Sequence, residues 1–171
     1  MSESQAAVRE ICDAIIKRVD RAYVAECGRK NEFPQKLWDM WVDTGLLSMG
    51  LSEEFGGSGG SLKDIVLALD LLHQEALLLP IAVTNFMSRE PIMHHATQAQ
   101  KERYLPPTAT GEEFFSFGIT EADSGTNTFK IKTTAIRQPD GTFLLNGGKT
   151  YVATPELLSS GALIVVSRGS F

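Results

Sequence analysis

Apolar residues change their spacing near Gly111. Before that residue they recur every three or four positions, which is typical of helices that bury one face. After it the apolar runs are short and rich in β-branched residues, which indicates strands. The sequence therefore predicts an α+β protein, with an all-α N-terminal domain over residues 1–112 and the first part of an antiparallel β domain over residues 113–171.

Two helices are predicted at the start of the chain. One apolar stripe predicts a first helix over residues 4–27, and Gly28 is expected to end it as a C-terminal cap. A second helix is predicted from Pro34 to Gly45. Proline suits a first helical turn because the N–H that it lacks would have no partner inside the helix.

A third helix is predicted over residues 62–79, where Ser61 and Asp64 form a capping box. This segment is apolar on nearly every side, which predicts that it is buried among other helices. Further helices are predicted up to about His95 and over residues 98–105.

Short β-rich runs follow from Phe114 onward. They cover residues 114–120, 130–138, 142–147, 149–154 and 162–168. The Pro-Asp-Gly and Asn-Gly-Gly turns between them, at residues 139–141 and 146–148, favour antiparallel hairpins. A sheet that ended at the last run would expose a flat apolar edge, so we expect further chain or a partner to cover it.

Composition narrows the function classes. The 171 residues carry 16 Lys and Arg against 21 Asp and Glu, a net charge of −5, which argues against a non-specific nucleic-acid binder. Only two cysteines occur, Cys12 and Cys27, far too few for a disulfide scaffold. The chain shows neither a signal peptide nor an apolar run of about 20 residues, so a cytoplasmic protein without a membrane span is expected.

Two apparent motifs do not meet the requirements of their chemistry. The glycines of residues 56–60 have no strand before them and no Lys-Ser/Thr after them, which favours a flexible turn over a phosphate loop. His94 and His95 are adjacent, so they point apart on a helix, and no further ligand pattern accompanies them. No metal site is expected.

The segment of residues 117–126, followed by residues 145–153, is the most informative. A strand leads into a loop of small residues that exposes backbone N–H groups and the hydroxyls of Thr120, Ser124 and Thr126. Such a loop suits a planar polar ring with a pyrophosphate. The alternative interpretation is a plain strand–turn–strand without a ligand, and composition alone favours it.

The chain resembles the N-terminal part of the acyl-CoA dehydrogenases, the flavin-dependent family that desaturates acyl-CoA thioesters. The resemblance rests on the helix-then-strand order and on four motifs in sequence: SEEFGG (52–57), YLPPTATGE (104–112), ITEADSGT (119–126) and LLNGGKTYVA (144–153). It implies an oxidoreductase and flavoprotein of fatty acid metabolism. The middle domain would be barrel-like and incomplete here, and FAD would lie between it and a C-terminal helical domain with no counterpart in these residues.

The resemblance also implies site residues. FAD would be contacted by seven residues: Phe117, Ile119, Thr120, Thr126, Tyr151, Val152 and Ala153. Thr120 would donate to the pyrimidine edge of the flavin, and Thr126 would also touch the acyl-CoA. Ala153 stands where the family usually has threonine. No catalytic residue is expected, because the glutamate base belongs to the C-terminal domain, so this chain alone is expected to be inactive.

The implied partners are the acyl-CoA substrate, an electron-transfer flavoprotein and further subunits of a homo- or hetero-oligomer. A second hypothesis comes from a different class of protein. The loop of residues 122–127 departs from the pattern of the family, as Ala153 does. Both departures are compatible with a non-catalytic interaction module that kept the fold and lost the cofactor. The sequence leaves both hypotheses open.

Overall fold

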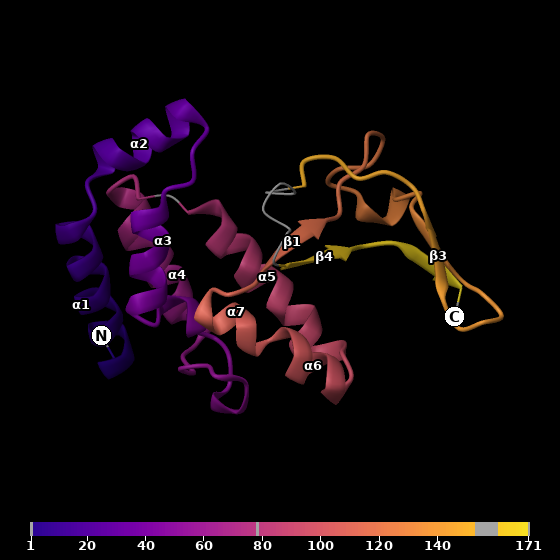
Figure 1. Cartoon of the computed structure of the whole chain (residues 1–171), viewed down its shortest axis with the longest axis horizontal. Coiled ribbons are helices and arrows are strands. Elements are labelled where there is room, and N and C mark those ends of the chain that lie inside the picture. Colours follow the sequence, from indigo (N-terminus) through magenta and orange to yellow (C-terminus); the bar gives the residue numbers. More distant parts are fainter. Residues whose placement is uncertain (1, 78, 153–160, 171) are drawn as a thin grey trace.

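A computed structural model describes residues 2–77, 79–152 and 161–170, in which helices precede strands (Figure 1). The α-helices are α1 (Glu3–Arg18), α2 (Arg21–Lys30), α3 (Gln35–Asp43), α4 (Leu62–Gln74), α5 (Pro80–His95), α6 (Gln98–Tyr104) and α7 (Pro106–Thr110). Short 3-10 helices are η1 (Leu46–Ser48), η2 (Glu53–Phe55) and η3 (Thr128–Lys130), and the strands are β1 (Phe114–Gly118), β2 (Thr134–Arg137), β3 (Phe143–Asn146), β4 (Gly161–Val165) and β5 (Arg168–Ser170). The predicted fold class is confirmed.

The prediction of one long first helix is wrong, because the chain breaks between α1 and α2. Val19 is extended and buried, and the Asp20 carboxylate accepts a hydrogen bond from the Ala22 N–H at 2.8 Å. Asp20 therefore begins a new helix as its N-cap. Gly28 lies inside α2, and the C-cap is instead Asn31, a residue in the left-handed region with φ of 55°. The signal for this break was Asp20 itself, because aspartate is a preferred N-cap residue.

The next helices follow the sequence closely. α3 begins directly after Pro34, and its buried face includes Trp38 and Trp41. The capping box of α4 is confirmed, since the Asp64 carboxylate accepts from the Ser61 N–H at 2.8 Å. α4 ends at Gln74, several residues earlier than predicted, and α7 was not anticipated.

The strands form two small sheets without a closed barrel in the described part of the chain. β2 and β3 form the antiparallel hairpin that the Pro-Asp-Gly turn predicts. β1 pairs with β4 and β2 pairs with β5, both in parallel. The second predicted hairpin does not form, because residues 149–152 adopt no strand, and the rest of that predicted run lies outside the described residues.

No helix in the described ranges is long and apolar enough to cross a bilayer. The main helical core instead buries side chains of α1, α3, η1, α4 and α5 against one another. Its fully or nearly fully buried members include Cys12, Ile15, Leu37, Trp41, Leu46, Leu47, Leu72 and Ala82. Burial raises the pKa of the Cys12 thiol to about 11, so this cysteine stays protonated at neutral pH.

A buried cation connects three helical elements. Arg89 of α5 is 1% exposed, and its guanidinium donates to the Leu47 carbonyl of η1 and to the hydroxyl and carbonyl of Thr108 in α7. The donors thus meet neutral oxygens rather than a carboxylate. Burial lowers the pKa of Arg89 to about 9, so the group remains charged at neutral pH.

Replacing the Thr108 hydroxyl is therefore expected to destabilise the fold. Thr108→Val leaves the Arg89 Nε donor, at 2.9 Å from the hydroxyl, without its acceptor, which should lower the free energy of unfolding by about 1–3 kcal/mol. Thr108→Ser is the control, because it keeps the hydroxyl and loses one methyl group, worth about 0.8 kcal/mol. Urea unfolding of the parent and the two variants measures both decreases in the free energy of unfolding. Equal decreases would contradict the role of this hydrogen bond.

Candidate functional site

The strand and loop singled out in the sequence lie at the end of β1. Phe117 is half-buried in β1, opposite Ile164 of β4. Ile119 and Thr120 follow directly, both half-buried, and the loop continues to the exposed Thr126. The strand thus delivers these residues into a loop, as predicted.

The second singled-out segment lies alongside this loop. The Thr150 N–H donates to the Thr120 carbonyl at 2.8 Å, and Lys149 Nζ donates to the Ile119 carbonyl at 3.0 Å. Tyr151 follows in the left-handed region with φ of 56° and is 93% exposed, and Val152 is half-buried. Ala153 lies outside the described residues. The structure therefore brings residues 119–120 and 149–150 together.

The loop pairs some of its own polar groups and leaves others available. Glu121 and Ser124 exchange backbone hydrogen bonds at 2.9 and 3.1 Å, and the Ser124 hydroxyl donates to the Asn127 carbonyl. The expectation that the Ser124 hydroxyl is exposed is therefore wrong. Within the described ranges, the N–H groups and hydroxyls of Thr120 and Thr126 form no hydrogen bond.

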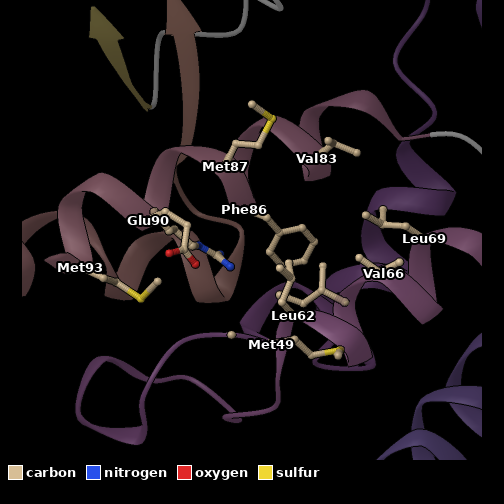
Figure 2. Close-up of a pocket in the computed structure, with 12 residues that line it drawn as sticks. Met49, Leu62, Val66, Leu69, Val83, Phe86, Met87, Glu90 and Met93 are labelled. Carbon is tan, nitrogen blue, oxygen red and sulfur yellow. The ribbon is translucent and has the colours of Figure 1, made fainter. Parts of the chain in front are cut away.

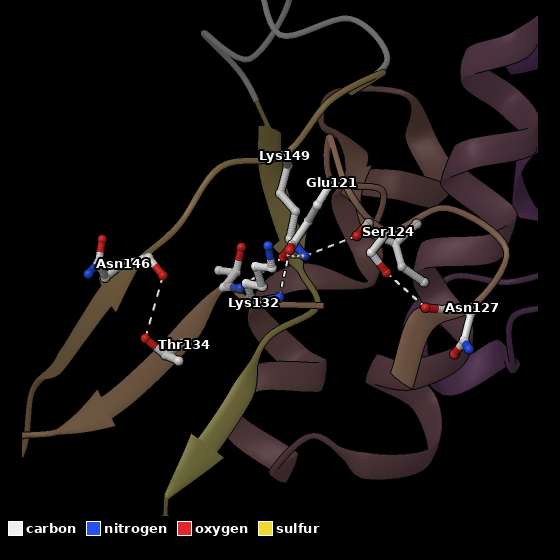
Figure 3. A network of polar contacts seen from close by, with 9 residues as sticks. Glu121, Ser124, Asn127, Lys132, Thr134, Asn146 and Lys149 are labelled. Atoms are coloured by element: carbon white, nitrogen blue, oxygen red, sulfur yellow. Dashed lines mark hydrogen bonds and ion pairs between the residues drawn. The ribbon is translucent and has the colours of Figure 1, made fainter. Parts of the chain in front are cut away.

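Beneath the loop lies a buried ion pair that sequence reasoning missed (Figure 3). Lys149 Nζ lies 2.8 Å from Glu121 Oε1, and both side chains are 7% exposed. The same carboxylate accepts the N–H groups of Lys132 and Thr133 at 2.6 and 2.9 Å. The hydrogen bond from Lys149, with those from the two amides, lowers the pKa of Glu121 to about 2. An acid and a base spaced 28 residues apart carry no local sequence signal.

A separate apolar groove of about 180 Å³ lies between α4 and α5 (Figure 2). Val66 and Leu69 of α4 line one side of it, and Phe86 and Met87 of α5 line the other side. Val66 is 55% exposed beside the groove and Leu62 is 74% exposed, so the prediction that this helix is buried on every side is wrong. The outer apolar face of α4 borders the groove instead.

Comparison with known proteins decides the family. The family model described as "Acyl-CoA dehydrogenase, N-terminal domain" matches residues 2–112. This chain belongs to the acyl-CoA dehydrogenase family. The members are FAD-dependent oxidoreductases of fatty acid metabolism, so the resemblance inferred from the sequence is confirmed.

Individual relatives support this assignment. The chain is 30% identical to the acyl-CoA dehydrogenase FadE12 of Mycobacterium tuberculosis over 168 residues, 98% of this chain and 42% of that protein. It is 26% identical over 165 residues, 95% of this chain and 43% of the relative, to the CarC subunit of the caffeyl-CoA reductase–Etf complex of Acetobacterium woodii. This chain spans less than half the length of these curated relatives.

A solved structure shows the shared fold. The glutaryl-CoA dehydrogenase of Mycobacterium smegmatis in complex with FADH2 superposes with a TM-score of 0.87 at 21% identity, covering 99% of this chain and 44% of that one. At this identity the likeness concerns the fold alone.

The lowered pKa of Glu121 predicts a pH-dependent stability. Folding lowers the pKa of the Glu121 carboxyl from 4.5 to about 2. The carboxylate therefore contributes to the free energy of unfolding above pH 4.5, and this contribution is lost as the pH falls from about 4.5 to about 2. Glu121→Gln should unfold more easily than the parent at neutral pH, and the difference should shrink across this window. Urea unfolding at a series of pH values measures it, and a difference that is constant with pH would contradict the assignment.

Proposed function

We propose that this chain supplies part of the flavin and substrate site of an FAD-dependent acyl-CoA dehydrogenase. One observation carries the proposal: the hydrogen bond from Thr150 to Thr120, at 2.8 Å, joins the two segments proposed to contact FAD. In the family these segments hold the cofactor, and here they lie side by side with hydrogen-bond donors available.

The residues present fit a flavin. We assign the contacts to Phe117, Ile119, Thr120, Thr126, Tyr151, Val152 and Ala153. The N–H groups and hydroxyls of Thr120 and Thr126 have no partner in the part of the chain that the structure describes, so they are available to polar ring atoms and to phosphate. When bound, FAD supplies the acceptor for the hydride that leaves the β-carbon of the thioester.

The chain's own residues then have binding and orienting roles. Thr120 would donate toward the pyrimidine edge, where preorganised donors stabilise the negative charge of a reduced ring. Thr126 would lie at the acyl-CoA as well as at FAD. The groove between α4 and α5 is lined mainly by apolar side chains, which supports an acyl group as the apolar part of the substrate (Figure 2).

Other parts of the reaction would come from outside this chain. The glutamate that removes the α-proton belongs, in the family, to the C-terminal helical domain. We propose an electron-transfer flavoprotein as the electron acceptor, a homo- or hetero-oligomer as the working assembly, and the cytoplasm as its location. The division into domains at residues 112 and 113 is part of the same proposal.

Titration with FAD tests this assignment on the chain completed by a C-terminal helical domain of the family, because the cofactor would lie between the two. Binding should quench flavin fluorescence, and Thr120→Val and Thr126→Val should each weaken it roughly five- to ten-fold, because each removes one hydrogen bond worth about 1 kcal/mol. Thr110→Val is the control, since this exposed hydroxyl of α7 donates only to the Pro107 carbonyl among the described residues.

The outcome separates the two hypotheses from the sequence. Unchanged flavin fluorescence with the completed protein in excess over FAD would contradict the proposed cofactor site. It would favour the non-catalytic interaction module. Equal weakening by all three substitutions would contradict the specific roles of Thr120 and Thr126.

A further inference from the structure

We infer that the buried pair of Glu121 and Lys149 is a positioning device, which fixes the register of the two segments proposed to contact FAD. This inference deepens the proposed function and rests on it only for the cofactor. The pair itself is a feature of the described structure, so it is testable without any ligand.

The contacts between the two segments form a consecutive series. Lys149 Nζ donates to the Ile119 carbonyl at 3.0 Å and to Glu121 Oε1 at 2.8 Å. Between these two contacts, the Thr150 N–H donates to the Thr120 carbonyl at 2.8 Å. A shift of one residue would move the Lys149 ammonium and the Thr150 N–H away from these acceptors and break all three contacts.

The Glu121 carboxylate is itself held in place. It accepts the N–H groups of Lys132 and Thr133 at 2.6 and 2.9 Å, which ties it to the segment that leads into β2. The ammonium of Lys149 therefore meets an acceptor whose position is set by the backbone. Because both side chains are nearly inaccessible to water, their attraction is screened far less than that of a surface pair.

The turn before Lys149 is shaped to permit this approach. Gly147 has a φ of 153°, and a Cβ atom there would lie 2.3 Å from Thr133 Oγ1 and 2.6 Å from Thr133 Cα. The backbone of the turn thus passes directly over Thr133, whose N–H binds Glu121. Only a residue without a side chain allows the close approach that lets Lys149 reach the carboxylate.

An exposed ion pair near Glu121 serves as a comparison. Lys132 Nζ lies 2.6 Å from Asp123 Oδ2, but these side chains are 72% and 68% exposed. Exposed pairs of this kind contribute little to structure. Lys132→Met therefore removes a positive charge near Glu121, while the main-chain N–H of residue 132 still binds the carboxylate.

Amide hydrogen exchange, measured by NMR on the full chain, tests the inference. In Lys149→Met, exchange of the Thr150 N–H should accelerate roughly ten-fold or more, because the neighbouring contacts to Ile119 and Glu121 are lost. Amides within α5 should be unaffected. Lys132→Met should leave Thr150 at its parent rate, and Lys149→Arg, which retains a cationic donor, should restore most of the protection.

FAD titration then reads the functional consequence. Lys149→Met should weaken FAD binding roughly ten-fold and shift the absorption band of the bound flavin, whereas Lys132→Met should do neither. If the completed parent protein binds no FAD, the proposed function is contradicted, while the exchange data still decide the positioning role.

The results that overturn the inference are specific. An unchanged Thr150 exchange rate in a folded Lys149→Met protein would overturn it, as would equal acceleration by Lys132→Met. Should Lys149→Met fail to fold, Glu121→Gln replaces it, because the amide keeps the size of the side chain, removes its charge and exchanges one acceptor oxygen for an NH2 donor. Parent-like Thr150 exchange in Glu121→Gln would then overturn the inference.

Discussion

A carboxylate removed from water organises the strand-rich half of this protein. Glu121 lies at the meeting point of the loop after β1, the segment before β2 and the segment after β3, and its three donors come from the last two of these. A buried charge that loses its partner retains its full desolvation penalty. The three segments are therefore held to a single arrangement, and the surface proposed to contact FAD is the outer side of that arrangement.

The helical half depends on polar contacts of another kind. Arg89 binds only neutral oxygens in the described structure, and Asn85, one turn earlier in α5, accepts the Phe115 N–H of β1 at 3.2 Å while it donates to the Thr108 carbonyl. α5 thus contacts α7, η1 and β1 through two buried side chains. The apolar core supplies most of the buried area. The hydrogen bonds of Arg89 and Asn85 position α7, η1 and the start of β1 against α5.

Local sequence rules predicted the elements that local interactions determine. Pro34, the Ser61–Asp64 capping box and the Pro-Asp-Gly turn all act within a few residues, and each was found where expected. The break at Asp20 was missed because the apolar stripe continues across it. The parallel pairing of β1 with β4 joins residues almost 50 positions apart, so no periodicity could reveal it.

The candidate site shows the same division. The segment around Thr120 could be predicted from its small residues and from family resemblance, whereas the contact of Lys149 with Glu121 could not. The hydroxyls of Thr120 and Thr126 form no hydrogen bond within the described residues, as anticipated, but that of Ser124 is used inside the loop. Whether a hydroxyl in a loop points outward depends on turn geometry, which composition alone does not determine.

The hairpin strand β3 has a consequence for handling the protein. Phe143, Leu144 and Leu145 are consecutive and each more than half exposed, so both faces of this strand are apolar, and β3 lies at the edge of its sheet. An edge strand presents backbone N–H and C=O groups to another strand, and here exposed apolar side chains lie beside them. At the high concentrations of a spectroscopic sample, self-association through this edge would compete with the native state, and a lysine at Leu144 is the natural safeguard.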